Sequence, residues 1–131
     1  MLRGPVVGYQ LSEESAIWQL ACGDYGQTKS AVFALVYLTN PAAQYSFLPF
    51  KYPKGVNRGL DEHVLMDPRW DLRTRTVTGI HTEGSGKDCG SLERHRVTAE
   101  GAFELGELRL RDTCDGKPVG VENFPVVFKA K

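Results

Sequence analysis

Two polar side chains in segment 83–87 are of the types that nucleophilic chemistry needs. Ser85 stands two positions before Lys87, and a lysine amine that acts as a base can activate a serine hydroxyl. The nucleophile elbow of α/β hydrolases would require glycine at positions 83 and 87, whereas Glu83 and Lys87 occupy them. We therefore interpret Ser85 as a turn residue beside a solvated lysine and predict no catalytic residue.

The histidines do not have the spacing of a metal site. His63, His81 and His95 form no His-x-x-x-His pair, and we expect exposed histidines on strands. His81 and Glu83 would share one strand face and offer two ligands, but a metal site normally needs three or four. No glycine-rich phosphate loop of the Walker or Rossmann type occurs. The sequence predicts neither a metal nor a cofactor.

Acidic side chains leave one catalytic class open. Two carboxylates that meet in space can hydrolyse a glycan, and the 16 Asp and Glu residues allow many such pairs. A small cell-wall hydrolase is therefore one alternative function, and a carrier of a small ligand inside a barrel is another. Because the sequence favours no particular pair, we predict that the protein is not an enzyme.

Two segments are candidates for binding a partner. The first is an aromatic segment that contains Tyr45 and Phe47, because such rings often anchor interfaces; alternatively, the rings cover an open end of the fold. The second is a loop with Ser85, Lys87 and Asp88, which would project charge at its tip; alternatively, it is a plain turn. We predict these five residues as the partner-binding candidates.

Composition and charge exclude several classes of protein. A length of 131 residues fits a single domain over 1–131, and 41% apolar with 24% charged residues argues against disorder. Sixteen basic and 16 acidic residues cancel, which removes the attraction behind non-specific nucleic-acid or anionic-membrane binding. No apolar run approaches the roughly 18 residues of a membrane span. We expect no nucleic-acid partner and no membrane insertion, and the sequence does not indicate an oligomeric state.

Strands must position these candidates, because alternation with period two dominates the chain. The segments expected to be strands are 16–22, 31–38, 63–66, 74–83, 92–98, 102–111 and 124–130. The first could also be a helix capped by Ser12, but Gly23-Asp24-Tyr25-Gly26 would end a strand as a turn. The apolar run 31–38 suits a strand buried on both faces.

The later part of the chain indicates a hairpin and an edge. Segments 92–98 and 102–111 would pair around Glu100-Gly101, and a bulge at Gly106 would keep the leucines on both sides of it facing the core. Prolines in segment 44–55 make that stretch a loop or an edge strand. These strands predict an all-β fold, an antiparallel β-sandwich or barrel of about seven strands.

The three cysteines form no Cys-x-x-Cys pair, so neither a thioredoxin-type site nor a zinc ribbon is indicated. Cys89 and Cys114 lie at turn-rich ends of strand-like segments. A bond between them would close a loop of about 25 residues and add roughly 3 kcal/mol of stability; two free buried thiols are the equal alternative. Cys22 lies in an apolar stretch, and we expect it to be a small core residue.

Short motifs in a fixed order also resemble a known family. They are Ile17-Trp18-Gln19-Leu20-Ala21-Cys22, Asp67-Pro68-Arg69-Trp70-Asp71, Thr76-Val77-Thr78, Asp88-Cys89-Gly90, Gly101-Ala102-Phe103-Glu104-Leu105, Cys114-Asp115-Gly116 and Phe124-Pro125-Val126-Val127-Phe128-Lys129-Ala130. Over most of its length the chain thus resembles an uncharacterised bacterial family, domain of unknown function 1176. It departs from the family in segment 83–87, which lacks the usual Arg, and at Arg94-His95-Arg96, where aromatic residues are expected.

The resemblance implies a location more than an activity. Members of the family are exported, largely Gram-negative envelope proteins, often with a second domain N-terminal to this one, and have no assigned reaction. The resemblance implies a Cys89–Cys114 disulfide, since oxidising compartments preserve such bonds. It also implies a periplasmic or secreted protein, although Met1 to Pro5 does not form a signal peptide. We therefore predict a non-catalytic binding or structural domain that recognises a protein or an envelope component.

Overall fold

The computed structural model describes residues 7–25, 28–39, 45–56, 61–83, 88–117 and 119–130. Within these residues it is all-β, with one short 3-10 turn and no helix long and apolar enough to cross a membrane. The elements are β1 (Val7–Gln10), β2 (Ser15–Tyr25), β3 (Thr28–Tyr37), β4 (Tyr45–Phe47), β5 (Leu65–Met66), β6 (Arg69–Asp71), β7 (Thr76–Glu83), β8 (Cys89–Val97), β9 (Phe103–Arg111), η1 (Val121–Asn123) and β10 (Val126–Lys129).

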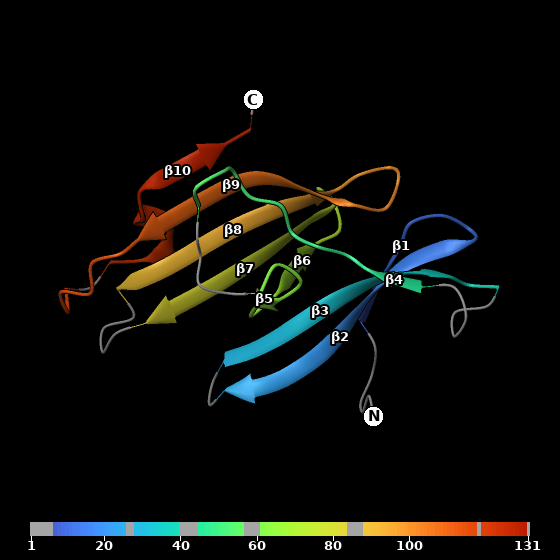
Figure 1. Cartoon of the computed structure of the whole chain (residues 1–131), viewed down its shortest axis with the longest axis horizontal. Helices are drawn as coiled ribbons and strands as arrows, with labels where there is room; N and C mark the ends of the chain where they lie inside the picture. Colours follow the sequence, from blue (N-terminus) through green and yellow to red (C-terminus); the bar gives the residue numbers. More distant parts are fainter. Residues whose placement is uncertain are drawn as a thin grey trace.

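The strands form two antiparallel sheets (Figure 1). The first sheet has the order β1-β2-β3-β4, with β5 also paired to β3, and the second has the order β10-β9-β8-β7-β6. The all-β sandwich is therefore confirmed. The barrel alternative is wrong, because the two sheets do not close on each other. The prediction of about seven strands did not include β1 and β6, which have four and three residues.

Buried side chains from both sheets form the main core. From the first sheet come Ile17, Phe33 and Leu65, and from the second come Val77, Val97 and Phe103. The segment between β4 and β5 contributes Leu48 and Phe50 to the same cluster. Across the core, the indole nitrogen Nε1 of Trp70 on β6 donates to Oε1 of Gln19 on β2 at 2.8 Å. The two sheets are thus joined by aromatic packing and by a polar contact.

The hairpin of β2 and β3 confirms a strand at 16–22 and excludes the helical alternative. It also corrects two predictions. Gly23, Asp24 and Tyr25 pair with β3 and do not form the predicted turn. Cys22 is exposed and is not a core residue, because the register shifts between Ala21 and Gly23 and this bulge interrupts the alternation of faces.

The hairpin of β8 and β9 confirms the predicted bulge. Arg94 pairs with Glu107 and His95 pairs with Leu105, so Gly106 is the extra residue of β9. Because the bulge shifts the phase, Leu105 before it and Leu108 after it are both buried.

Two glycines with positive φ provide a test of backbone strain. Gly90 has φ +132, and a Cβ there would collide with the carbonyl oxygen of His81. Gly116 has φ +81, and a Cβ there would meet nothing within 4 Å. We expect Gly90→Ala to lower the free energy of unfolding by about 2 kcal/mol more than Gly116→Ala, since both alanines are strained but only one also clashes. Urea unfolding of both variants measures the difference, and equal losses would contradict it.

Candidate functional site

The structure separates the predicted partner-binding residues. Ser85 and Lys87 lie outside the described residues. Tyr45 and Phe47 lie on β4, with 54% and 48% of their surface exposed and with ring centroids 5.7 Å apart. Figure 1 places β4 at one end of the long axis, and the adjoining ends of β7 and β8 near Asp88 at the other. Tyr45 and Phe47 therefore do not form a single site with Asp88, the described residue of the second candidate segment.

Asp88 is an internal anchor and not a surface contact. Its side chain is fully buried, and its Oδ2 accepts the backbone N–H groups of Asp115 and Gly116 at 2.9 Å each. Arg111 Nη1 also approaches Oδ2 at 3.2 Å. Burial raises the pKa of Asp88, but the hydrogen bonds from Gly116 and Asp115 outweigh it and hold the pKa below its ordinary value. This removes Asp88 from the predicted binding surface.

The predicted disulfide is present beside Asp88. Cys89 and Cys114 are bonded, with their Cα atoms 5.1 Å apart. Arg111 also donates a hydrogen bond to the carbonyl oxygen of Thr113 at 2.8 Å and forms an ion pair with Asp115 at 3.1 Å. The covalent bond and these charged contacts together tie the segment after β9 to the start of β8.

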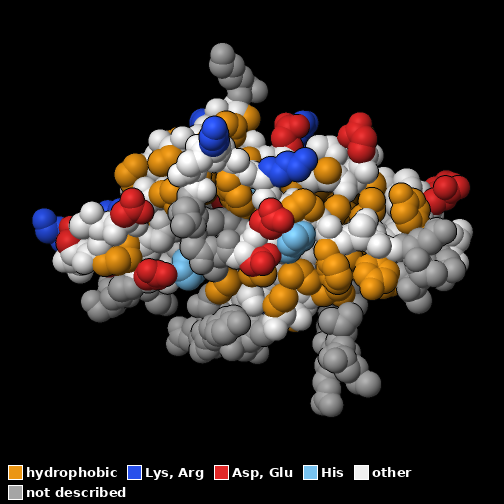
Figure 2. Space-filling model, in the orientation of Figure 1, with side chains coloured by type: hydrophobic (Ala, Val, Ile, Leu, Met, Phe, Trp, Pro, Cys, Tyr) orange, Lys and Arg blue, Asp and Glu red, His pale blue; other side chains and the backbone are white. Residues whose placement is uncertain are grey.

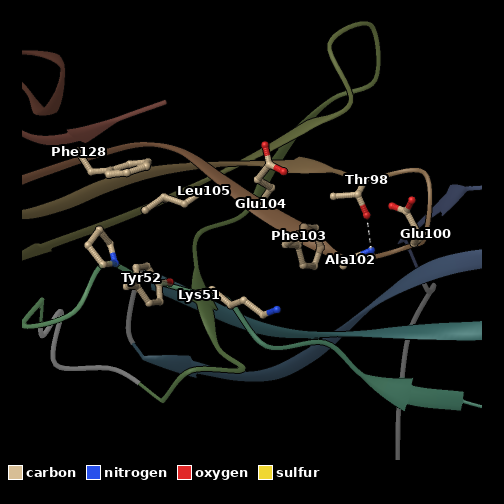
Figure 3. Close-up of a pocket in the computed structure, with 10 residues that line it drawn as sticks. Lys51, Tyr52, Thr98, Glu100, Ala102, Phe103, Glu104, Leu105 and Phe128 are labelled. Carbon is tan, nitrogen blue, oxygen red and sulfur yellow. Dashed lines mark hydrogen bonds between the residues drawn. The ribbon is translucent and has the colours of Figure 1, made fainter. Parts of the chain in front are cut away.

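A groove of about 550 Å³ lies where β9 and β10 meet the segment that leads from β4 to β5 (Figure 3). Figure 3 shows Leu105 and Phe128 of the sheet on one side, with Lys51 and Tyr52 on the other. The residues that line it are Lys51, Tyr52, Pro53, Thr98, Glu100, Ala102, Phe103, Glu104, Leu105 and Phe128. The sequence did not predict this site, because it combines three segments that are distant in the chain.

A buried polar network fixes one wall of the groove. The hydroxyl of Tyr52 and Nε2 of His95 both hydrogen-bond Oε1 of Glu93, the latter at 2.7 Å. His95 is completely buried, and its ring packs against Phe50 at a centroid distance of 4.6 Å. The expectation of exposed strand histidines is therefore wrong for His95, which faces the core between the two sheets.

Charged groups flank the apolar lining of the groove. Lys51 lies on the side of the β4–β5 segment, whereas Glu100 and Glu104 lie on the side of the β8–β9 hairpin. Arg96 pairs with Glu104 at 3.2 Å in an exposed position. The groove thus offers a positive group on one side and carboxylates on the other, around Phe103, Leu105 and Phe128.

A smaller pocket of about 140 Å³ lies beside the disulfide and includes His81, Glu83 and Ser91. His81 Nε2 lies 3.0 Å from Glu83 Oε1, which confirms that these two side chains share a strand face. Ser91 is opposite His81 on the neighbouring strand, but its buried Oγ has no hydrogen-bond partner among the described atoms. The serine and histidine therefore lack the contact that would activate a nucleophile.

The described part of the chain contains no group of three His, Cys, Asp or Glu side chains that could hold a metal ion.

On the outer face of the second sheet, an ion-pair network holds η1 against the strands. Glu107 accepts hydrogen bonds from Arg94 and from Arg109, the latter at 2.8 Å. Arg94 also pairs with Glu122 of η1 at 2.7 Å, and Arg109 donates to the carbonyl oxygen of Glu122 at 2.5 Å. Burial raises the pKa of Glu107, but the two guanidinium groups lower it by a larger amount. The pKa of Glu107 therefore lies below its ordinary value.

This lowered pKa predicts a pH-dependent loss of stability. A glutamate in the unfolded chain has a pKa of about 4.3. The stabilisation by ionised Glu107 is therefore complete above about pH 5. It is lost as the pH falls through the lower pKa of the folded state. We expect Glu107→Gln to cost about 1–3 kcal/mol at pH 7, with a difference from wild type that shrinks toward pH 3. Urea unfolding across this range measures it.

Glu104→Gln serves as the matched control, because the Glu104 ion pair is exposed and such pairs contribute about 0–1 kcal/mol. A gap between wild type and Glu107→Gln that does not change between pH 7 and pH 3 would contradict the prediction.

Comparison with known proteins identifies no relative. No protein-family model matches the chain, and neither a curated protein nor a solved structure shows significant similarity to it. The function is therefore inferred from the groove and its surroundings.

Proposed function

We propose that the protein is a non-catalytic binding domain of the periplasm or another exported compartment, and that it recognises a protein or an envelope component through the groove. The observation that carries the proposal is the groove itself, with aromatic and aliphatic walls and charges at its border. Its volume of about 550 Å³ falls in the range of ligand sites, roughly 300–1,000 Å³.

The lining has the composition of a contact surface. Tyr52, Phe103 and Phe128 provide aromatic surface, and buried aromatic anchors surrounded by polar groups carry most of the energy of protein interfaces. Lys51, on the opposite side from the glutamates, gives a partner one favourable orientation, because complementary charges fix register.

The walls of the groove are already in place in the free protein. Tyr52 is held by its bond to the buried Glu93, and Phe103 packs against Phe50 at 4.7 Å. Side chains that are ordered before binding lose little conformational entropy on binding. This arrangement supports a groove that is built to bind, rather than a gap left by loose packing.

Two observations bear on the compartment and on the class of partner. The Cys89–Cys114 disulfide supports an oxidising compartment, in agreement with the resemblance to domain of unknown function 1176. On the face shown in Figure 2, acidic and basic side chains of the described residues are interspersed. Such a surface favours a partner other than a strongly charged polymer.

Binding is favoured over hydrolysis by the environment of the acidic groups at the groove. A pair of catalytic carboxylates needs one acid that apolar surroundings keep protonated. Glu104 is instead exposed and paired with Arg96, and Glu100 is exposed at the hairpin turn.

The proposal predicts that a component of an envelope extract binds saturably to the immobilised domain, and biolayer interferometry measures this binding. We expect Phe128→Asp and Lys51→Glu each to weaken it at least about tenfold, as loss of an interface anchor does. Val127→Asp is the matched control, because Val127 is adjacent but 48% exposed and does not line the groove. Thermal unfolding of each variant verifies the fold, and Lys51→Glu changes only an exposed side chain.

Full binding by both groove variants would refute the proposed site. Loss on replacing Tyr45 and Phe47 by serine would place the contact on β4, and loss on Lys87→Ala would place it on the charged loop.

A further inference from the structure

The outer edge of β9 is only partly covered by β10. The two strands pair from Glu107 to Arg109, and the last described contact is the N–H of Ala130, which donates to the carbonyl oxygen of Gly106 at 2.8 Å. Along Phe103–Leu105, no strand in the described part of the chain pairs with this edge. Within the residues that the structure describes, the sheet therefore has a short open edge in line with β10.

The direction of the backbone groups follows from the hairpin. The carbonyl oxygen of Ala102 accepts the N–H of Thr98, so Ala102 faces β8. Because residues of an antiparallel strand alternate between its two neighbours, the N–H and C=O groups of Phe103 and Leu105 point away from β8. These groups face the open edge.

The groove lies at this same edge. Phe103 and Glu104 both line it, although one side chain is buried and the other is exposed. Consecutive side chains of a strand point to opposite faces of the sheet. A groove that contacts both Phe103 and Glu104 must therefore lie at the edge of the strand. Figure 3 shows Phe103, Glu104 and Leu105 in succession along β9, with Phe128 of β10 beyond Leu105.

We propose that the partner presents an extended polypeptide segment, which adds to β9 as a further strand antiparallel to it and in line with β10. This proposal rests on the proposed function and names its ligand class. Strand addition supplies affinity through main-chain hydrogen bonds and specificity through pockets for alternate side chains. The backbone groups of Phe103 and Leu105 would form the main-chain hydrogen bonds. The lining around Tyr52, Leu105 and Phe128 would form the pockets for side chains.

The geometry sets the pattern of the segment. Backbone groups on one side of a strand repeat about every 6.6 Å, a spacing that a polypeptide reproduces and a glycan does not. At this rise, about three residues of an added strand would lie along the open edge at Phe103–Leu105. Residues that face the core side would be apolar and lie against Phe128, and those between them would lie beside Glu104 and Arg96.

The border of the edge also favours an added strand of defined charge. Lys51 is exposed on one side and Glu100 on the other, and charges beside an open edge discourage unspecific pairing. A segment with an acidic residue near Lys51 and a basic residue near Glu100 would fit this border.

The test uses the whole wild-type chain and a phage-displayed library of random 12-residue linear peptides. The peptide selected is synthesised with single backbone N-methyl groups at each position in turn. We expect methylation at alternate positions to weaken binding at least tenfold and methylation at the positions between them to have little effect. Hydrogen exchange of the Phe103 and Leu105 amides should slow on binding, while the amides of β6, at the other edge of the sheet, serve as the control.

The outcomes separate this inference from the proposed function. A selected peptide that Phe128→Asp releases, but that shows no alternation on methylation and no slowed exchange, overturns strand addition and leaves the groove as a binding site. If no peptide is enriched but a glycan from the envelope extract binds saturably, the inference that the ligand is a polypeptide is overturned. A wild-type dimer in which both amides are already protected would assign the edge to a second copy of the chain and overturn the proposal as well.

Discussion

The insertion of Phe50 between the two sheets is the contact on which the rest of the structure depends. Its ring lies 5.6 Å from Phe33 of the first sheet and 4.7 Å from Phe103 of the second. Phe50 belongs to neither sheet, so its burial fixes the position of the segment that carries it. Tyr52 follows two residues later and forms a wall of the groove. The core and the candidate site are therefore one packing unit.

The polar residues that β8 contributes to this unit specify its register. Glu93 forms a hydrogen bond with Nε2 of His95 in the core and accepts a second one from the hydroxyl of Tyr52. Buried polar groups are costly when unpaired and rigid when paired. A slip of β8 by one residue would turn Arg94 and Arg96 toward the core, because every side chain would change face. That alternative is excluded by the desolvation of two guanidinium groups.

Local patterns predicted most of the strands, the bulge at Gly106 and the placement of Cys89 and Cys114 near strand ends. These features depend on alternation and on turn residues that lie within a few positions of each other in the sequence. The bulge at Cys22 has no comparable signal, and the residue was wrongly expected in the core. The burial of His95 depends on Tyr52 and Phe50, which lie far away in the sequence. The groove could not be predicted for the same reason, since Lys51, Glu100 and Phe128 meet only after the sheets have packed.

The bulge at Gly106 connects the stability of the fold with the open edge beside it. It keeps Leu105 and Leu108 in the core, and it is also where the described pairing with β10 ends. The open backbone groups thus belong to residues whose side chains are fixed in the core, with Phe103 packed against Phe33 at 5.4 Å. An edge held in this way needs little ordering when a strand is added. Affinity would then come from the main chain, so a partner's sequence would be constrained only at the positions that enter the groove.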